Sequence, residues 1–189
     1  MEEPQINPLF RTRRSPYVFD PGREVSQSDL DAIFEAARWA MSSYNAQPWR
    51  YVLGVKGRNT PVWEAIHGVL VEGNQPWARY APVLALGVVE HCFEHNGKRN
   101  RAAVHDLGAA SAFLTLEATA RGLYVHQMIG IHPETAHEVF KLGETQEAYT
   151  ALAIGYVGSD TGIDEEYVER DAGPRERKPL AEIVWTGGF

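Results

Sequence analysis

The polar run from Ser42 to Trp49 carries more binding chemistry than any other stretch of the chain. It reads Ser-Ser-Tyr-Asn-Ala-Gln-Pro-Trp, and places two hydroxyls and two amides (Ser42, Ser43, Asn45 and Gln47) beside a large aromatic ring. Connections between elements are short and plain unless they hold something. This set of donors and acceptors beside an indole suits a flat ligand with polar edges. The alternative is a hydrogen-bonded turn followed by a core tryptophan.

Basic residues gather near both ends of a chain whose net charge is -7. Arg13, Arg14 and Ser15 lie near the N-terminus, and Arg175 and Arg177 lie near the C-terminus. Arginine matches the geometry of phosphate with paired hydrogen bonds, so two such clusters brought together would grip one anion. The other interpretation is that the two basic segments are separate, solvated tails. Charge alone favours this second interpretation.

Other catalytic patterns are weak. His91, Cys92, Glu94 and His95 have the residue types of a metal site, but no second pair of ligands follows at conventional spacing. We therefore predict no metal, and keep a metal-dependent protein built on His91 and His95 as a competing hypothesis. The sequence also has no signature of a nucleophile with its base or of paired catalytic carboxylates, so no side chain is assigned a catalytic role.

Bulk composition limits the class of protein. The 189 residues suit a single domain spanning 1–189, and 44% hydrophobic with 23% charged residues is usual for a globular protein. The acidic net charge argues against a nucleic-acid partner. No apolar run approaches the roughly 20 residues of a membrane-spanning helix, so no membrane partner is expected. A single cysteine and the lack of a signal-peptide pattern predict a cytoplasmic protein.

The elements that would position these residues follow from hydrophobic periodicity. Helices are expected at 27–41, 61–72, 102–121 and 133–140, and strands at 50–56, 83–89, 123–129 and 149–157. This order lacks the regular βαβ rhythm of a doubly wound sheet, so the fold class is expected to be α+β. The helix over 102–121 carries a run of small residues, Gly108-Ala109-Ala110-Ser111-Ala112, which favours close packing in the core or against another subunit. The tail from 158 to 189 is polar but ends in an apolar Ile-Val-Trp string, as if it packed outside its own core.

Several short sequence strings occur in a characteristic order over most of the chain. They are Arg13-Arg14-Ser15, Ala36-Ala37-Arg38-Trp39-Ala40, Ser42 to Trp49, Asp106-Leu107-Gly108-Ala109-Ala110, Gly122-Leu123, Gln127-Met128-Ile129-Gly130, Ala153-Ile154-Gly155-Tyr156 and Arg177-Lys178-Pro179-Leu180. Each string is weak alone, but the ordered set is specific. With this set the chain resembles the FMN-dependent nitroreductase family.

The resemblance implies a mixed central sheet flanked by helices, in an intertwined homodimer whose C-terminal extension embraces the partner. FMN would lie at the subunit interface, with its phosphate and ribityl chain held by Arg13, Ser15, Arg175 and Arg177, and with Arg14 in the same string. Ser42, Ser43 and Asn45 would approach the flavin from the partner subunit, with Gln47 close to it. The backbone amide near Ile129 and Gly130 would point at flavin N5. Tyr17 stands where the family usually has a basic residue, so it could donate a hydrogen bond to the flavin but no charge.

The resemblance also implies the reaction. NADH or NADPH would pass a hydride to flavin N5, and a nitroaromatic or quinone-type acceptor would then take two electrons in the same pocket, giving ping-pong kinetics. The chemistry would belong mainly to the cofactor. The competing hypothesis within the family is an FMN-binding protein that stores or senses flavin with little turnover.

Overall fold

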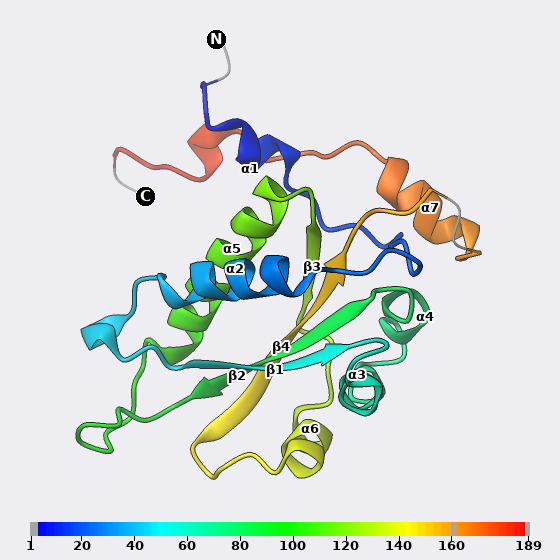
Figure 1. The fold of residues 1–189 in the computed structure, drawn as a ribbon. Helices are drawn as coiled ribbons and strands as arrows, with labels where there is room; N and C mark the ends of the chain where they lie inside the picture. Colours follow the sequence, from blue (N-terminus) through cyan, green and yellow to red (C-terminus); the bar gives the residue numbers. More distant parts are fainter. Residues whose placement is uncertain (1–3, 160–161, 188–189) are drawn as a thin grey trace.

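The computed structural model describes residues 4–159 and 162–187. Its centre is a four-stranded sheet in the order β1-β2-β4-β3, formed by Trp49–Val55, Val83–Glu90, Gln146–Gly155 and Tyr124–Met128 in that order (Figure 1). Every neighbouring pair in this sheet is antiparallel. The α+β class is confirmed.

One feature of the sheet differs from the mixed sheet that the resemblance implied. Strands β2 and β3 run in the same direction and are connected through helix α5, but β4 lies between them and pairs with both. No two parallel strands are therefore neighbours in the described part of the sheet. Strand β3 is left at one edge, with a strand partner on one side only.

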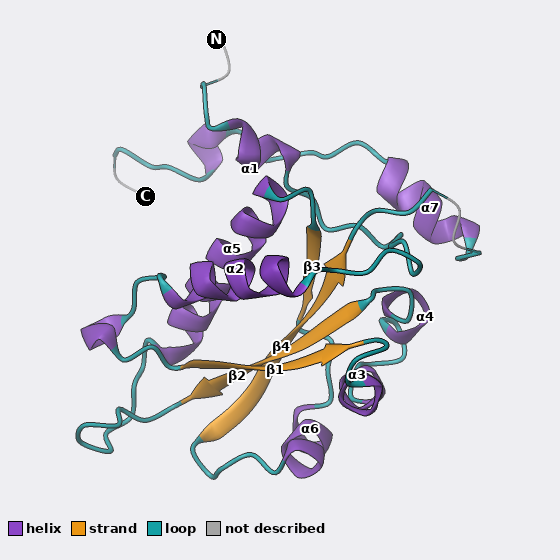
Figure 2. Ribbon diagram, viewed as in Figure 1, coloured by secondary structure: helices purple, strands orange, loops and turns teal. Residues whose placement is uncertain are grey.

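Helices cover both faces of the sheet (Figure 2). Helices α2 and α5 lie on one face, and α3, α4 and α6 lie on the other. The helix bounds are α1 Pro8–Thr12, α2 Gln27–Arg38, α3 Thr60–Gly68, α4 Gln75–Ala78, α5 Ala103–Ala120, α6 Pro133–Phe140 and α7 Glu165–Ala172, with 3₁₀ turns at Ser43–Asn45 and Leu180–Glu182. All eight elements expected from periodicity are present. The helix expected over 61–72 stops at Gly68, because Leu70 forms an isolated bridge with Ile131.

The sheet separates two apolar cores. Alternate residues of β2 point to opposite faces, as strand geometry requires. Val83 and Ala85 pack in the core below α2 and α5, while Leu84 and Leu86 pack in the core below α3 and α4. Both faces of β2 are thus buried, and the strand forms a rigid base for the segments at the sheet ends.

Helix α2 delivers the polar run 42–47 to its place. The Ser26 hydroxyl caps the helix by accepting a hydrogen bond from the Asp29 backbone N–H at 3.0 Å. Leu30 and Ile33 anchor the inner face of the helix in the core. Beyond Arg38 the chain leaves the helix, and the polar run begins three residues after Trp39.

Helix α5 has a second apolar surface besides the one that it buries. Leu107 and Leu114 are buried, whereas Gly108, Ala112 and Phe113 form an exposed stripe at helical spacing. Small exposed residues allow another backbone to approach closely. Of the helices described, none has both the length and the apolarity that crossing a bilayer requires.

Candidate functional site

The two basic ends of the chain meet. The N-terminal arm and the C-terminal tail lie side by side around α1 in Figure 1. The Arg175 guanidinium donates to the backbone carbonyl of Arg13 at 2.6 Å and also to that of Arg11. The Arg13 guanidinium donates to the Ser15 hydroxyl at 3.2 Å. Residues 162 positions apart are therefore joined into one basic site.

The charges of this site are concentrated. Burial lowers the pKa of Arg13, and the positive charges of Arg177 and Arg175 lower it further. Two guanidiniums close enough to lower the pKa of a third favour an anion between them. Arg175 gives its donors to backbone carbonyls and fixes the geometry, whereas Arg13 and Arg177 bring their charges to the site. Arg177 makes one hydrogen bond, at 2.6 Å, to the carbonyl of Glu176.

Arg14 lies apart from this group. Its guanidinium is 3.8 Å from an Asp171 carboxylate oxygen and 5.9 Å from the centre of the Tyr124 ring. The same carboxylate accepts from the backbone N–H groups of Tyr17, at 3.0 Å, and Val18, at 2.9 Å. Asp171 thus fastens α7 to the arm that carries Arg13. Sequence reasoning missed Asp171, because its partners lie more than 150 residues away and no local pattern marks it.

The Tyr17 side chain packs inside an aromatic cluster. Its ring centre is 5.2 Å from that of Trp77, 4.8 Å from that of His126 and 5.5 Å from that of Tyr167. Burial lowers the pKa of His126, although the Pro16 carbonyl, 3.0 Å from Nδ1, and Asp171 oppose this shift. Tyr17 is therefore a packing residue of the arm, and its contact with a flavin stays a prediction.

At the end of the edge strand β3, Ile129 and Gly130 expose two backbone donors. The Gly130 carbonyl accepts from the Val71 N–H at 3.1 Å and from the Asn74 side-chain amide at 3.0 Å. The N–H groups of Ile129 and Gly130 have no hydrogen-bond partner among the described residues. Two adjacent free donors beside an exposed apolar side chain (Ile129, 69% exposed) suit the polar edge of a planar ring.

Gly130 is required by close packing. A Cβ at this position would lie 2.5 Å from Asn74 Nδ2 and 2.9 Å from Val71 Cγ2. A side chain fits there only if the side chains of Asn74 and Val71 shift. Sequence reasoning selected Gly130 but missed Asn74, which follows an unremarkable turn and gains its role only by reaching across to β3.

The polar run folds into a strained turn. Tyr44, Asn45 and Gln47 have φ angles of 53°, 54° and 46°, in the left-handed region that residues other than glycine rarely adopt. Internal bonds support it: the Gln47 N–H donates to the Ser42 hydroxyl at 3.1 Å, and the Gln47 side-chain amide donates to Asn45. Such strain persists only where the surroundings impose it, and it clusters at functional sites.

One buried carboxylate ties this turn to the body of the protein. Asp106, 3% exposed and in the first turn of α5, accepts a hydrogen bond from the Ser43 backbone N–H at 3.0 Å. Tyr44, which is 87% exposed, is steadied by an edge-to-face contact with Phe93 at 5.8 Å. No sequence pattern assigned Asp106 a role of its own, since an aspartate early in a helix is explained equally well by the helix dipole.

The turn and the arginines lie at opposite ends of α5. Asp106 holds Ser43 at the start of the helix, whereas α1, which ends directly before Arg13, lies beside the other end of α5 (Figure 1). The 18 residues between Ala103 and Ala120 span about 27 Å at ~1.5 Å per residue. A ligand held by Arg13 would have to cross this whole length to reach the turn of its own chain.

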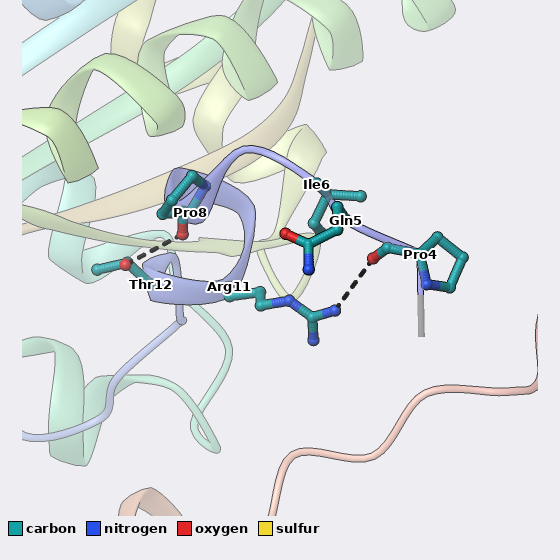
Figure 3. A pocket seen from close by; sticks show the side chains of 6 residues that line it. All are labelled: Pro4, Gln5, Ile6, Pro8, Arg11 and Thr12. Carbon is teal, nitrogen blue, oxygen red and sulfur yellow. Dashed lines mark hydrogen bonds between the residues drawn. The ribbon is translucent and has the colours of Figure 1, made fainter. Parts of the chain in front are cut away.

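Two cavities accompany these elements. An apolar one of about 270 Å³ lies between α5 and the ends of β3 and β4, and is lined by Val104, Leu107, Gly108, Ser111, Gln127, Met128, Ile129, Tyr149 and Thr150. A larger one of about 500 Å³ lies inside the N-terminal segment, where Arg11 donates to the Pro4 carbonyl at 3.5 Å and Thr12 donates to that of Pro8 (Figure 3). Among the described residues, Arg11 is the only charged one in its lining, so the apolar cavity beside Ile129 is the better candidate for a reacting substrate.

The histidines near Cys92 are used elsewhere. His91 pairs with Glu147 at 2.6 Å, and His95 contacts Asn96. In residues 4–159 and 162–187 no three histidine, cysteine or acidic side chains come together as metal ligands would.

Known proteins resemble this chain in sequence and in fold. The model of the Nitroreductase family matches residues 10–156. An uncharacterized 15.4 kDa protein of Mycolicibacterium smegmatis is 32% identical over 73% of the chain and 95% of its own length. A putative NADH dehydrogenase/NAD(P)H nitroreductase of Streptomyces coelicolor is 37% identical over 47% of the chain, which spans 42% of that relative.

The structural comparison agrees. A crystal structure described as an oxidoreductase containing FMN superposes with a TM-score of 0.91 and 31% identity, over 100% of this chain and 95% of that one. The resemblance drawn from the ordered strings is confirmed, and the chain belongs to the nitroreductase family.

Proposed function

We propose that this protein is an FMN-dependent oxidoreductase that takes two electrons from NADH or NADPH and passes them to nitroaromatic or quinone-type acceptors. The observation that carries the proposal is the convergence of Arg13, Arg175 and Arg177 from the two chain ends. This basic site fits the phosphate of FMN in charge and in donor type. The relatives named above, an FMN-containing oxidoreductase and a putative NAD(P)H nitroreductase, support the choice of cofactor and donor.

The chain's own residues divide the work of holding the cofactor. Arg13 and Arg177 would neutralise the phosphate, and the Ser15 hydroxyl would add a hydrogen bond. The free N–H groups of Ile129 and Gly130 would donate to the polar edge of the ring system. When bound, FMN supplies hydride acceptance from the nicotinamide and two-electron delivery to the acceptor. The apolar cavity beside Ile129 would exclude water from the exchange.

The site would be completed by a second copy of the chain. Ser42, Ser43, Asn45 and Gln47 lie at the far end of α5 from the arginines, so one FMN would meet them on a partner subunit. The exposed stripe of α5 offers a surface for that contact. The tail offers a second surface, since Ile183, Val184 and Trp185 are each more than half exposed. We therefore propose a homodimer with two equivalent sites, embraced by the C-terminal extensions.

The visible spectrum tests the cofactor. Purified protein, or protein mixed with FMN and freed of excess dye, should carry flavin absorbance in a one-to-one ratio with the chain. Arg13→Met and Arg177→Met should each weaken FMN binding about tenfold, the worth of one charge-assisted hydrogen bond. Lys178→Met removes the same charge from the next position and is the control. A colourless protein that gains no flavin would disprove the assignment.

Anaerobic addition of NADH or NADPH tests the reaction. Bleaching of the bound flavin within seconds, followed by recovery with a quinone or nitroaromatic, would identify a reductase. Flavin that stays oxidised would instead identify the storage or sensing protein. The dimer is tested by mixing Arg13→Met protein with Ser43→Pro protein, which loses the N–H that Asp106 binds. Mixed dimers should recover FMN binding in one of their two sites, whereas a monomeric site would recover none.

A further inference from the structure

A third hollow opens where the chain enters α5. It has a volume of about 380 Å³ and is lined by His91, Arg99, Asn100, Arg101 and Val104. The guanidiniums of Arg99 and Arg101 form no hydrogen bond or ion pair with any described residue. Two unengaged arginines two positions apart around one hollow are an arrangement suited to an oxyanion.

The start of α5 adds further donors. The helix has 18 residues, and its N-cap, Ala102, offers no side-chain acceptor. The N–H groups of Val104 and His105 have no acceptor in the described part of the chain, so both donors of this first turn are open to a ligand. Asn100 is only 2% exposed, and its Nδ2 donor has no partner. Side-chain and backbone donors thus accumulate in one place.

Nearby acids are already engaged. Glu147 is 2.6 Å from His91, and Asp106 accepts from the Ser43 N–H. The groups around the hollow that remain unengaged among the described residues are donors, those of Arg99, Arg101 and Asn100.

This basic hollow adjoins the apolar cavity beside Ile129. Val104 lines both of them. The apolar cavity, with Ile129 and Tyr149 in its wall, has room for a planar ring, and the basic hollow lies next to it along α5. The two cavities therefore meet at Val104, one with an apolar lining and the other with two arginines in its lining.

We propose that Arg99 and Arg101 bind an oxyanion group of the substrate, while the substrate's planar part occupies the cavity beside Ile129. This inference rests on the proposed function, since it names the substrate class of that same site. The oxyanion has two sources: a phosphate of the dinucleotide donor, or a carboxylate or sulfonate on the acceptor. Substrates that carry such a group are preferred over uncharged analogues of the same ring.

Steady-state kinetics of Arg99→Gln and Arg101→Gln test the proposal. Lys98→Gln, which removes a charge from the same loop without lining the hollow, is the matched control. In the donor arm NADPH is compared with N-benzyl-dihydronicotinamide, which has no phosphate. In the acceptor arm 4-nitrobenzoate is compared with nitrobenzene. Each arginine variant should raise KM about tenfold for the charged member of a pair and leave the uncharged member unchanged.

The arm that responds identifies the source of the oxyanion. An arginine variant that matches Lys98→Gln in both arms overturns the proposal. Calorimetric titration of the purified protein with NADP⁺ and with 4-nitrobenzoate gives a readout that needs no turnover. If the protein reduces neither member of a pair, the proposed function fails. Calorimetric binding of either ligand that is lost in Arg99→Gln but kept in Lys98→Gln would still support the anion site. Equal binding of both ligands by Arg99→Gln, Arg101→Gln and Lys98→Gln would reject it.

Discussion

Asp106 gives the sharpest test of how the strained turn serves the site. Its buried carboxylate holds the Ser43 N–H at 3.0 Å and is the one hydrogen bond from α5 to the turn in the described structure. Three left-handed residues in the turn cost on the order of 1–3 kcal/mol each. Without a hydrogen bond from outside the turn, this backbone strain favours relaxation of the turn. Asp106→Ala should therefore release it.

The size of the effect follows from one bond. A hydrogen bond to a charged group is worth about 1.5–3 kcal/mol. If the turn relaxes by this amount, its competent population falls to roughly 1–10%, and the apparent affinity for FMN falls by the same factor. FMN binding should thus weaken about 10- to 100-fold.

The assay is quenching of FMN fluorescence on titration with flavin-free protein. Asp106→Asn keeps an acceptor oxygen at the same position and should bind FMN nearly as well as the wild type. Thr119→Ala is the stability control: it removes a buried hydroxyl that bonds to the Thr115 carbonyl at 2.8 Å, on the same helix but away from the turn. If Asp106→Ala binds FMN as tightly as Thr119→Ala does, the tether has no part in the site and the reasoning is wrong.

Three further predictions concern packing and charge. Gly130→Ala should lower stability by about 1–3 kcal/mol, measured by urea unfolding, because the new Cβ would lie 2.5 Å from Asn74 Nδ2; an unchanged midpoint would contradict the close packing. Asp171→Ala should cost about 2–4 kcal/mol by the same measurement, since two backbone donors lose their shared carboxylate, and a loss below 0.5 kcal/mol, taken as roughly the scatter of surface substitutions, would refute the clamp. Burial lowers the pKa of His126 below its ordinary 6.5, so the folded protein holds fewer protons than the unfolded chain. The stability contributed by neutral His126 should be complete above about pH 6.5 and lost as pH falls through the folded-state pKa. The melting temperatures of the wild type and of His126→Gln should therefore converge on acidification rather than stay parallel.

Hydrophobic periodicity predicted helices and strands well where local sequence alone determines their bounds. Helix α6 spans Pro133–Phe140 as expected, because a proline at its start and an apolar face define it locally. The helix expected over 61–72 was too long, since the pairing of Leu70 with Ile131 is a tertiary contact that no local pattern reports. Helices α1, α4 and α7 were not predicted; the first two are only five and four residues long.

The same distinction between local and tertiary signals applies to the candidate site residues. Sequence strings identified Arg13, Ser15 and Gly130, whose residue types are themselves the signal. They could not assign Asp171, Asn74 or Asp106, because each acts on a backbone group brought to it by the fold. Arg14 shows the converse limit. It shares a string with Arg13, yet it turns to Asp171, a partner visible only when α7 is placed against the arm.

The position of β3 at the edge of the sheet has a consequence for handling the protein. An edge strand with unpaired donors is a template on which another chain can add a strand, and proteins normally blunt such edges with charge, proline or a covering segment. Here Ile129 and Gly130 end the strand with two open N–H groups and an exposed apolar side chain. A flavin lying across them would serve as the missing cover. Solubility should then follow flavin supply, so protein made in flavin-starved cells should accumulate as aggregates, and FMN in the lysis buffer should keep it dispersed.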